Sequence, residues 1–337
     1  MLRLRTLVAL LVGPALALLV PDAVIRSSPG YWRLMAGWET GTTSAVEAAV
    51  RLRAPGSVDL VVLGNSLALS DLDEGRLADL LGTPAGGVLN LGVKTATAAE
   101  VAMLLPQVLE LEPRAAVLVV HSGMLADRRP GPAAGGRLQG VPEPTLYDPG
   151  VALRIYPPRA LWEDRGEHLR GALGAGNVFL RHRRDLRYLL TRLLLHGGRP
   201  PPFAHPRDFT RLPPPRLERA LVRARSWPLS FSADGTPASA VRVLAAGLER
   251  HGVALTVAPA PDHPAVRGTA YHPGYVAFVR RLAREVGFSL VDPAAFPAFT
   301  DRDFVDEFHM TASGREAFTA TVARHLAASA VGSGATP

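Results

Sequence analysis

Cysteine is absent from this chain of 337 residues. Its absence excludes a disulfide framework, an iron–sulfur cluster, a thiolate zinc site and a cysteine nucleophile. Lysine is almost absent, because Lys94 is the single one among 37 basic residues. Aromatic residues make up only 6% of the chain, and no zinc finger, RNP-type aromatic strand or basic zipper occurs. The net charge of +7 therefore reflects an arginine-rich composition, and we expect no nucleic-acid partner.

Motifs for several large enzyme classes are also missing. The chain has no H-E-x-x-H metal motif and no G-x-S-x-G nucleophile elbow. Neither a phosphate-binding G-x-x-x-x-G-K-[ST] loop nor a dinucleotide-binding G-x-G-x-x-G loop follows a predicted strand. We therefore expect no bound metal and no cofactor. Disorder is excluded as the main state, because 47% of the residues are hydrophobic.

The amino terminus has the pattern of an export signal. Two arginines within Met1–Arg5 precede an uncharged run over Thr6–Val20. Such a pattern is typical of a signal peptide or a signal anchor, and we assign residues 1–25 to it. We expect an exported protein, anchored in the membrane by this segment, with its domain outside the cytoplasm. Cleavage of the segment and a buried amino-terminal helix remain open alternatives.

The rest of the chain predicts an α/β fold. Five short apolar runs have the length of buried parallel strands: Val58–Leu63, Gly87–Leu91, Ala115–Val120, Val253–Val257 and Phe288–Val291. Segments of helical periodicity alternate with them: Ser44–Arg53, Asp73–Leu81, Ala96–Leu111, Arg159–Leu173, Asn177–His196, Arg216–Arg225, Ala238–His251, Tyr275–Val286 and Ala312–Ala328. Alternation of this kind predicts a three-layer α/β/α fold with a mostly parallel five-stranded sheet.

The composition changes along the chain and suggests its organisation. A region rich in arginine and proline follows the third strand, and we interpret it as a helical insertion. Its basic helix is either a solvated face or a contact for anionic lipid or glycan. The predicted parts are a linker with a helix (26–56), a first core part (57–125), the insertion (126–235), a second core part (236–330) and a flexible tail (331–337).

Polar residues with catalytic chemistry follow the predicted strands. In open parallel sheets, ligands bind beyond the carboxyl ends of the strands. Ser66 follows the first strand, and Asp306 and His309 precede the last helix. His309 is a candidate base for a Ser66 nucleophile, with Asp306 orienting the imidazole. The backbone N–H groups of Ser66 and Gly92 are candidate donors to an oxyanion.

These residues resemble the blocks of the SGNH (GDSL-like) hydrolase superfamily. Gly64-Asn65-Ser66 is similar to the first block, Asn90-Leu91-Gly92 to the second, and Asp306-x-x-His309 with Gly314 to the last. The resemblance implies that Ser66, His309 and Asp306 are catalytic. It also implies that Asn65, Asn90, Gly92 and Ser122 form the oxyanion or substrate site. The stretch matching the third block, His121–Met124, lacks the family's asparagine, so Ser122 or His121 substitutes or backbone donors act alone.

The overall plan is similar to one branch of that superfamily. The branch includes the D-alanine transfer proteins of teichoic-acid modification and alginate O-acetyltransferase-like proteins. The resemblance implies an esterase or O-acyltransferase that needs no cofactor and acts on an acylated glycan or other envelope polymer, with a membrane-bound acyltransferase as a partner. Two alternatives stay open: a non-catalytic glycan-binding or scaffold partner of such an acyltransferase, and a lipid-facing hydrolase.

Purely structural roles for some of these residues also stay open. Asp306 has the position of a helix cap, and Asp301 and Asp303 compete with it as the acid. Asp262 and His263 follow the fourth strand, but the prolines on either side predict a rigid loop there.

Overall fold

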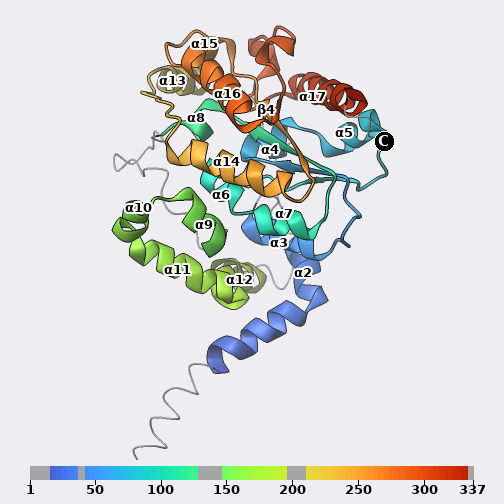
Figure 1. The fold of residues 1–337 in the computed structure, drawn as a ribbon, viewed down its shortest axis with the longest axis vertical. Helices are drawn as coiled ribbons and strands as arrows, with labels where there is room; N and C mark the ends of the chain where they lie inside the picture. Colours follow the sequence, from blue (N-terminus) through green and yellow to red (C-terminus); the bar gives the residue numbers. More distant parts are fainter. Residues whose placement is uncertain (1–15, 37–41, 128–145, 196–209, 333–337) are drawn as a thin grey trace, which may run out of the picture.

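The predicted three-layer α/β/α fold is confirmed. The computed structural model describes residues 16–36, 42–127, 146–195 and 210–332. A sheet of five parallel strands runs through its centre in the order β2-β1-β3-β4-β5 (Figure 1). The strands are β1 (Leu60–Leu63), β2 (Val88–Asn90), β3 (Ala115–Val120), β4 (Ala254–Pro259) and β5 (Ser289–Leu290). All five predicted strands are present, with small differences at their ends.

Burial on both faces explains why these segments are strands. β1 is wholly buried, and β3 is buried along all but its first residue. The two strands pair in register from Leu60 with Ala115 to Leu63 with Leu118. A strand covered on both sides reads as a continuous apolar run, as these two do. Their carboxyl ends therefore lie at the same edge of the sheet.

Two helical layers cover the sheet. One face packs on α3 (Thr43–Arg51), α6 (Ala98–Ala102), α7 (Leu105–Glu110), α14 (Thr236–Glu249) and α16 (His272–Val286). The other face packs on α4 (Ser66–Asp71), α5 (Glu74–Leu81) and α17 (Ala312–Gly332). The predicted single helix over Ala96–Leu111 is wrong, because α6 and α7 are separated at Met103 and Leu104. Pro106 lies in the first turn of α7, where its missing N–H costs nothing.

Within the described residues, six helices lie between β3 and α14, the helix that leads into β4. They are α8 (Ser122–Leu125), α9 (Pro149–Ile155), α10 (Pro158–Glu163), α11 (Arg165–Gly176), α12 (Val178–Leu195) and α13 (Pro214–Arg225). The prediction of one helix over Arg159–Leu173 is wrong, because the chain turns at Asp164 between α10 and α11. Figure 1 shows α9 to α12 on one side of the core and α13 at the opposite end, beside α15 (Pro264–Arg267).

The insertion is fastened to the core through a buried polar cluster. The imidazole of His182 on α12 bonds Ser44 Oγ through Nδ1 and Glu47 Oε2 through Nε2, both at 2.8 Å. Arg181 donates to the same carboxylate oxygen of Glu47 at 2.8 Å. His182 is fully buried, so these contacts hold α12 against α3 away from solvent.

A further helix over residues 16–27 precedes α2 (Pro29–Ala36). It projects from the body of the molecule in Figure 1. Asp22 accepts a hydrogen bond from the backbone N–H of Val178, and Arg26 donates to the carbonyl of Gly176. Residues 1–15 of the predicted signal segment and 333–337 of the predicted tail lie outside the described residues. No helix in the described ranges has both the length and the apolar character needed to cross a membrane.

Candidate active site

Ser66 lies directly beyond the carboxyl end of β1. Gly64 turns the chain there with a φ of 147°, and a Cβ at this position would lie 2.7 Å from the carbonyl oxygen of Val119. Asn65 caps α4, because its Oδ1 accepts the N–H of Leu67 at 3.0 Å. Ser66 is therefore the first residue of α4, and its side chain is half-buried at the edge of the sheet.

His309 and Asp306 reach Ser66 from the loop before α17. His309 Nε2 lies 3.0 Å from Ser66 Oγ, and His309 Nδ1 lies 2.8 Å from Asp306 Oδ2. The other carboxylate oxygen of Asp306 accepts the backbone N–H groups of Phe308 at 2.8 Å and of His309 at 2.7 Å. The loop thus fixes both the acid and the base, and the three predicted catalytic side chains form one continuous relay.

The charges of this relay stabilise its ionised forms. Burial alone raises the pKa of Asp306, but hydrogen bonds from the His309 ring and from two backbone N–H groups outweigh it and lower that pKa. Burial alone lowers the pKa of His309, but the hydrogen bond and charge of Asp306, with a contribution from Asp71, outweigh it and raise that pKa. Asp306 is therefore ionised at neutral pH and favours a proton on His309.

Asp71 is a site residue that the sequence analysis did not find. It is fully buried at the end of α4, and its Oδ1 accepts the backbone N–H of Met310 at 3.0 Å and the hydroxyl of Ser70 at 2.7 Å. Its Oδ2 has no hydrogen-bond partner among the residues that the structure describes. Burial raises the pKa of Asp71 to about 6, against the opposing effects of His309 and of the Met310 N–H. The signal for Asp71 in the sequence was an acidic residue that follows the short, mostly apolar stretch after Ser66.

The predicted oxyanion residues lie near Ser66, but some of their hydrogen-bond donors already have acceptors within the protein. Gly92 lies beside Asn65, since a Cβ on Gly92 would be 3.1 Å from the Asn65 carbonyl oxygen. The Gly92 N–H donates to Asn90 Oδ1 at 3.0 Å, and Asn90 Nδ2 donates to the Ala68 carbonyl at 2.6 Å. The Ser66 N–H, at the first turn of α4, needs no acceptor within the helix.

His121 and Ser122, the predicted substitutes for the missing asparagine, lie at the start of α8. The Ser122 hydroxyl is fully buried and lies beside the hydroxyl of Tyr271. His121 caps α8, because its Nδ1 accepts the N–H of Gly123 at 3.1 Å. The His121 ring lies 5.6 Å from that of Phe308, which stacks on Trp227 at 5.2 Å. Phe308 and Trp227 thus form an apolar aromatic pair, in which Phe308 directly precedes His309 in the chain and Trp227 comes from the insertion.

The competing acids and the Asp262–His263 pair have other partners. Asp303 Oδ2 accepts from the backbone and the hydroxyl of Thr300, which caps a short 3-10 helix. Asp262 is buried and pairs with His272 at 2.9 Å. His263 Nδ1 accepts the N–H of Ala265, as expected of a rigid loop. None of these contacts involves Ser66 or His309.

A basic cavity adjoins the catalytic loop. It has a volume of about 350 Å³ and is lined by Leu212, Arg216, Arg219, Ala220, Arg223 and Glu307. The arginines are spaced along α13, and Arg223 lies 3.6 Å from Glu307, the neighbour of Asp306. Leu212 also donates its N–H to the carbonyl of Val305 at 2.9 Å. The insertion is therefore attached to the loop that carries the candidate acid and base.

Comparison of the chain with protein-family models finds no matching family, and comparison with curated proteins finds no match.

Proposed function

We propose that the protein is an SGNH-type serine esterase or O-acyltransferase that acts on an acyl ester of a cell-envelope polymer. The observation that carries the proposal is the relay in which His309 Nε2 lies 3.0 Å from Ser66 Oγ and His309 Nδ1 lies 2.8 Å from Asp306. A serine hydroxyl becomes a useful nucleophile only when a positioned base accepts its proton. This arrangement supplies the base and the group that orients it.

The reaction proceeds through an acyl-serine. Ser66 Oγ attacks the ester carbonyl while its proton passes to His309 Nε2. The tetrahedral intermediate collapses, the bond to the alcohol oxygen breaks, and His309 returns the proton to the leaving alcohol. Water or a sugar hydroxyl then attacks the acyl-serine, with His309 again accepting the proton. The bond between the acyl carbon and Ser66 Oγ breaks, and His309 returns that proton to Ser66. Attack by water gives hydrolysis, and attack by a sugar hydroxyl gives transfer.

The surroundings support an anionic polymer as substrate. Arg216, Arg219 and Arg223 line the cavity beside the catalytic loop. Guanidinium groups bind carboxylate and phosphate through paired hydrogen bonds. The acyl ester therefore sits on a chain whose anionic groups contact α13. The aromatic pair of Phe308 and Trp227 offers apolar side chains for the acyl group itself.

We further propose an envelope location for the domain. The cationic start and apolar run of residues 1–25 support export and anchoring by the amino terminus. A membrane-bound acyltransferase is then a suitable partner, since it delivers acyl groups at the surface where the polymer lies.

Labelling with a fluorophosphonate tests the proposal. We expect intact-mass measurement to show one adduct on the full chain and none on Ser66→Ala. A control is Ser57→Ala, since Ser57 is exposed and its hydroxyl bonds the Ala54 carbonyl. Labelling of Ser66→Ala at the wild-type rate would contradict the assignment.

A scaffold function is the second candidate. The bond between Gly92 N–H and Asn90 Oδ1 favours it, because that donor is then not free to bind an oxyanion. Loss of one oxyanion donor typically costs about 10²–10³ in rate. A folded protein that takes up no fluorophosphonate, yet binds an acylated glycan or a membrane-bound acyltransferase, would support the scaffold and exclude the esterase.

A further inference from the structure

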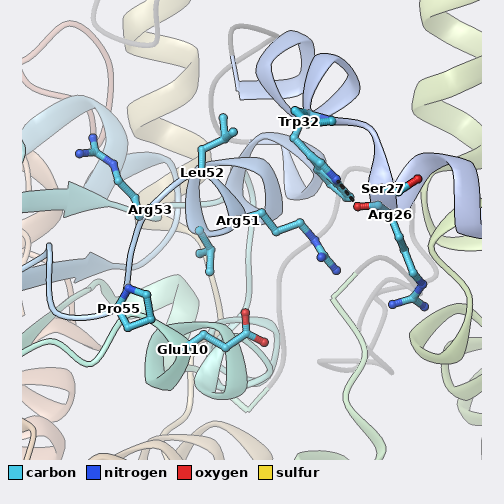
Figure 2. A pocket seen from close by; sticks show the side chains of 10 residues that line it. Arg26, Ser27, Trp32, Arg51, Leu52, Arg53, Pro55 and Glu110 are labelled. Atoms are coloured by element: carbon cyan, nitrogen blue, oxygen red, sulfur yellow. Dashed lines mark hydrogen bonds between the residues drawn. The ribbon is translucent and has the colours of Figure 1, made fainter.

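A second cavity lies far along the chain from the catalytic relay, beside the amino-terminal helix. Its volume is about 520 Å³. The walls come from the junction of residues 16–27 with α2, from the end of α3 and from Glu110 on α7. Figure 2 shows Arg51 reaching toward Arg26, with Glu110 below and Trp32 above. Arg53 also lines the cavity, but its side chain extends away from Arg26 in this view.

The two arginines are held in place before any ligand binds. Arg51 bonds Glu47 Oε1 through Nε at 3.0 Å and stacks on the Trp32 ring at 4.6 Å. Arg26 bonds Asp22 through Nε at 2.7 Å, and its Nη2 donates to the Gly176 carbonyl. Within the described residues, no hydrogen bond uses Nη1 of either arginine. Each side chain is thus ordered, and each retains donors for a ligand.

The cavity keeps positive charge at Arg51. The carboxylate of Glu47 is shared, because Arg181 and His182 also bond its Oε2 at 2.8 Å. One carboxylate therefore balances more than one cation. Glu110 lies on the opposite side as a single carboxylate. A ligand that satisfies both sides carries an anion for the arginines and a hydroxyl or ammonium donor for Glu110.

We propose that this cavity binds a phosphate ester, carried either by a phospholipid headgroup or by a free glycerol phosphate. Phosphate oxygens match the guanidinium donors of Arg26 and Arg51. The hydroxyl of a glycerol, or the ammonium of an ethanolamine, then reaches Glu110. Inorganic phosphate lacks that second donor, so its negative charge is repelled by the Glu110 carboxylate with no hydrogen bond to offset the repulsion.

The position of the cavity favours a lipid source. Val20 ends the apolar run, and Arg26 follows six residues later on the helix, or about 9 Å along its axis. The headgroup layer of a bilayer is on the order of 5–8 Å thick on each side. If residues 1–25 anchor the chain as proposed, the cavity lies at the outer edge of the headgroup layer. This step rests on the proposed anchor, whereas recognition of the phosphate ester does not.

Binding to the full chain in dodecyl maltoside micelles, which contain no phosphate, tests the proposal. The first arm titrates sn-glycerol 1-phosphate and inorganic phosphate by calorimetry. The second adds phosphatidylglycerol and counts bound lipid by native mass spectrometry. We expect one ligand per chain in at least one arm, with glycerol phosphate or the lipid bound more tightly than inorganic phosphate. Binding of the lipid alone identifies a headgroup site, and binding of the soluble ester identifies a free ligand.

Paired charge variants distinguish binding in the cavity from non-specific attraction of an anion to a basic protein. Arg26→Gln with Arg51→Gln is expected to weaken binding at least tenfold. Arg159→Gln with Arg170→Gln removes the same charge from two exposed arginines that also pair with nearby carboxylates, and should leave binding unchanged. Arg51→Lys keeps the charge but loses the planar guanidinium, so it tests whether binding needs the paired hydrogen bonds of that group. Equal binding by the two double variants, or no stoichiometric binding in either arm, overturns the proposal, whereas fluorophosphonate labelling of Ser66 is unaffected by that outcome.

Discussion

The carboxylate of Asp71 accepts the backbone N–H of Met310 at 3.0 Å. Asp71 ends the helix that Ser66 begins, and Met310 follows His309 in the chain. One short helix therefore presents the candidate nucleophile at its amino end and holds the loop of the candidate base at its carboxyl end. The geometry between Ser66 and His309 depends on this contact as well as on Asp306.

Asp71→Asn tests that dependence. Asparagine keeps an acceptor for the Met310 N–H but removes a charge that raises the pKa of His309. We expect the pH of half-maximal fluorophosphonate labelling of Ser66 to move downward, with the plateau rate changed only a few-fold. Asp71→Ala removes the acceptor as well and should lower the rate at every pH. An unchanged pH profile in Asp71→Asn would exclude electrostatic contact between Asp71 and His309.

The wild-type labelling rate should rise with pH through the pKa of His309. The imidazole accepts the Ser66 proton only when it is neutral, and its pKa lies above the ordinary value. The rate is therefore low below that pKa and reaches its plateau above it. Asp306→Asn should lower the plateau by about 10⁴, because the imidazole loses the partner that fixes its tautomer. Labelling rates of both proteins across pH 5–9 provide the measurement, and a rate independent of pH would contradict His309 as the base.

The basic cavity predicts a separation of binding from chemistry. Arg219→Gln on α13 removes a cavity charge that touches neither Ser66 nor His309 in any described contact. We expect KM for an acylated anionic polymer to rise several-fold while kcat and labelling by a small fluorophosphonate stay unchanged. Arg250→Gln, on the exposed end of α14, is the matched control. A fall in kcat with unchanged KM would argue against substrate contact by α13.

The sheet could be predicted because each strand is a short apolar run buried on both faces. Val58–Leu63 and Ala115–Val120 carry that pattern without ambiguity, and Ser66 and His309 follow from the edge where parallel strands end. Helix breaks were harder to predict. The turn at Asp164 between α10 and α11 interrupts no periodicity in the sequence, so the prediction joined the two helices.

The contacts that were missed depend on residues distant in sequence. Asp71 and Met310 are 239 positions apart, and nothing near either residue indicates their pairing. The same holds for Glu47 and His182 on α3 and α12. The hydrogen bond from Gly92 to Asn90 is local, but the sequence pattern does not tell which acceptor that N–H takes. Tertiary packing decides each of these cases.

Glu47 should be a major source of stability for the insertion. Burial alone raises its pKa, but the hydrogen bond from His182 and the charges of Arg181, His182 and Arg51 lower it to about 2. Glu47→Gln leaves a buried arginine and imidazole without their counter-charge, so we expect a loss of about 3–5 kcal/mol. Urea unfolding at pH 7 measures it.

The control for Glu47 is an exposed ion pair. Glu163→Gln breaks a pair with Arg159 at the surface and should leave stability nearly unchanged, because solvent screens exposed ion pairs. The depressed pKa also fixes the sign of the pH effect. Stability from Glu47 is complete above its ordinary pKa of 4.5 and is lost as pH falls toward 2. Equal losses for Glu47→Gln and Glu163→Gln would show that the buried cluster does not fasten the insertion.

Gly64 should tolerate no side chain, because it faces two constraints at once. Its φ of 147° disfavours any other residue, and a Cβ would lie 2.7 Å from the Val119 carbonyl oxygen and 2.8 Å from Ala68 Cβ. Gly56 has a φ of 72°, but beyond its chain neighbours no atom of the described residues lies within 4 Å of its Cβ position, so Gly56→Ala measures the conformational cost alone, about 1–2 kcal/mol. Gly64→Ala adds overpacking of about 1–3 kcal/mol, and the shift of β1 against β3 moves Ser66 away from His309.

We therefore expect Gly64→Ala to be less stable than Gly56→Ala in urea unfolding and to lose fluorophosphonate labelling, while Gly56→Ala retains it. Equal stability and equal labelling of the two variants would mean that the turn before Ser66 adapts without disturbing the relay.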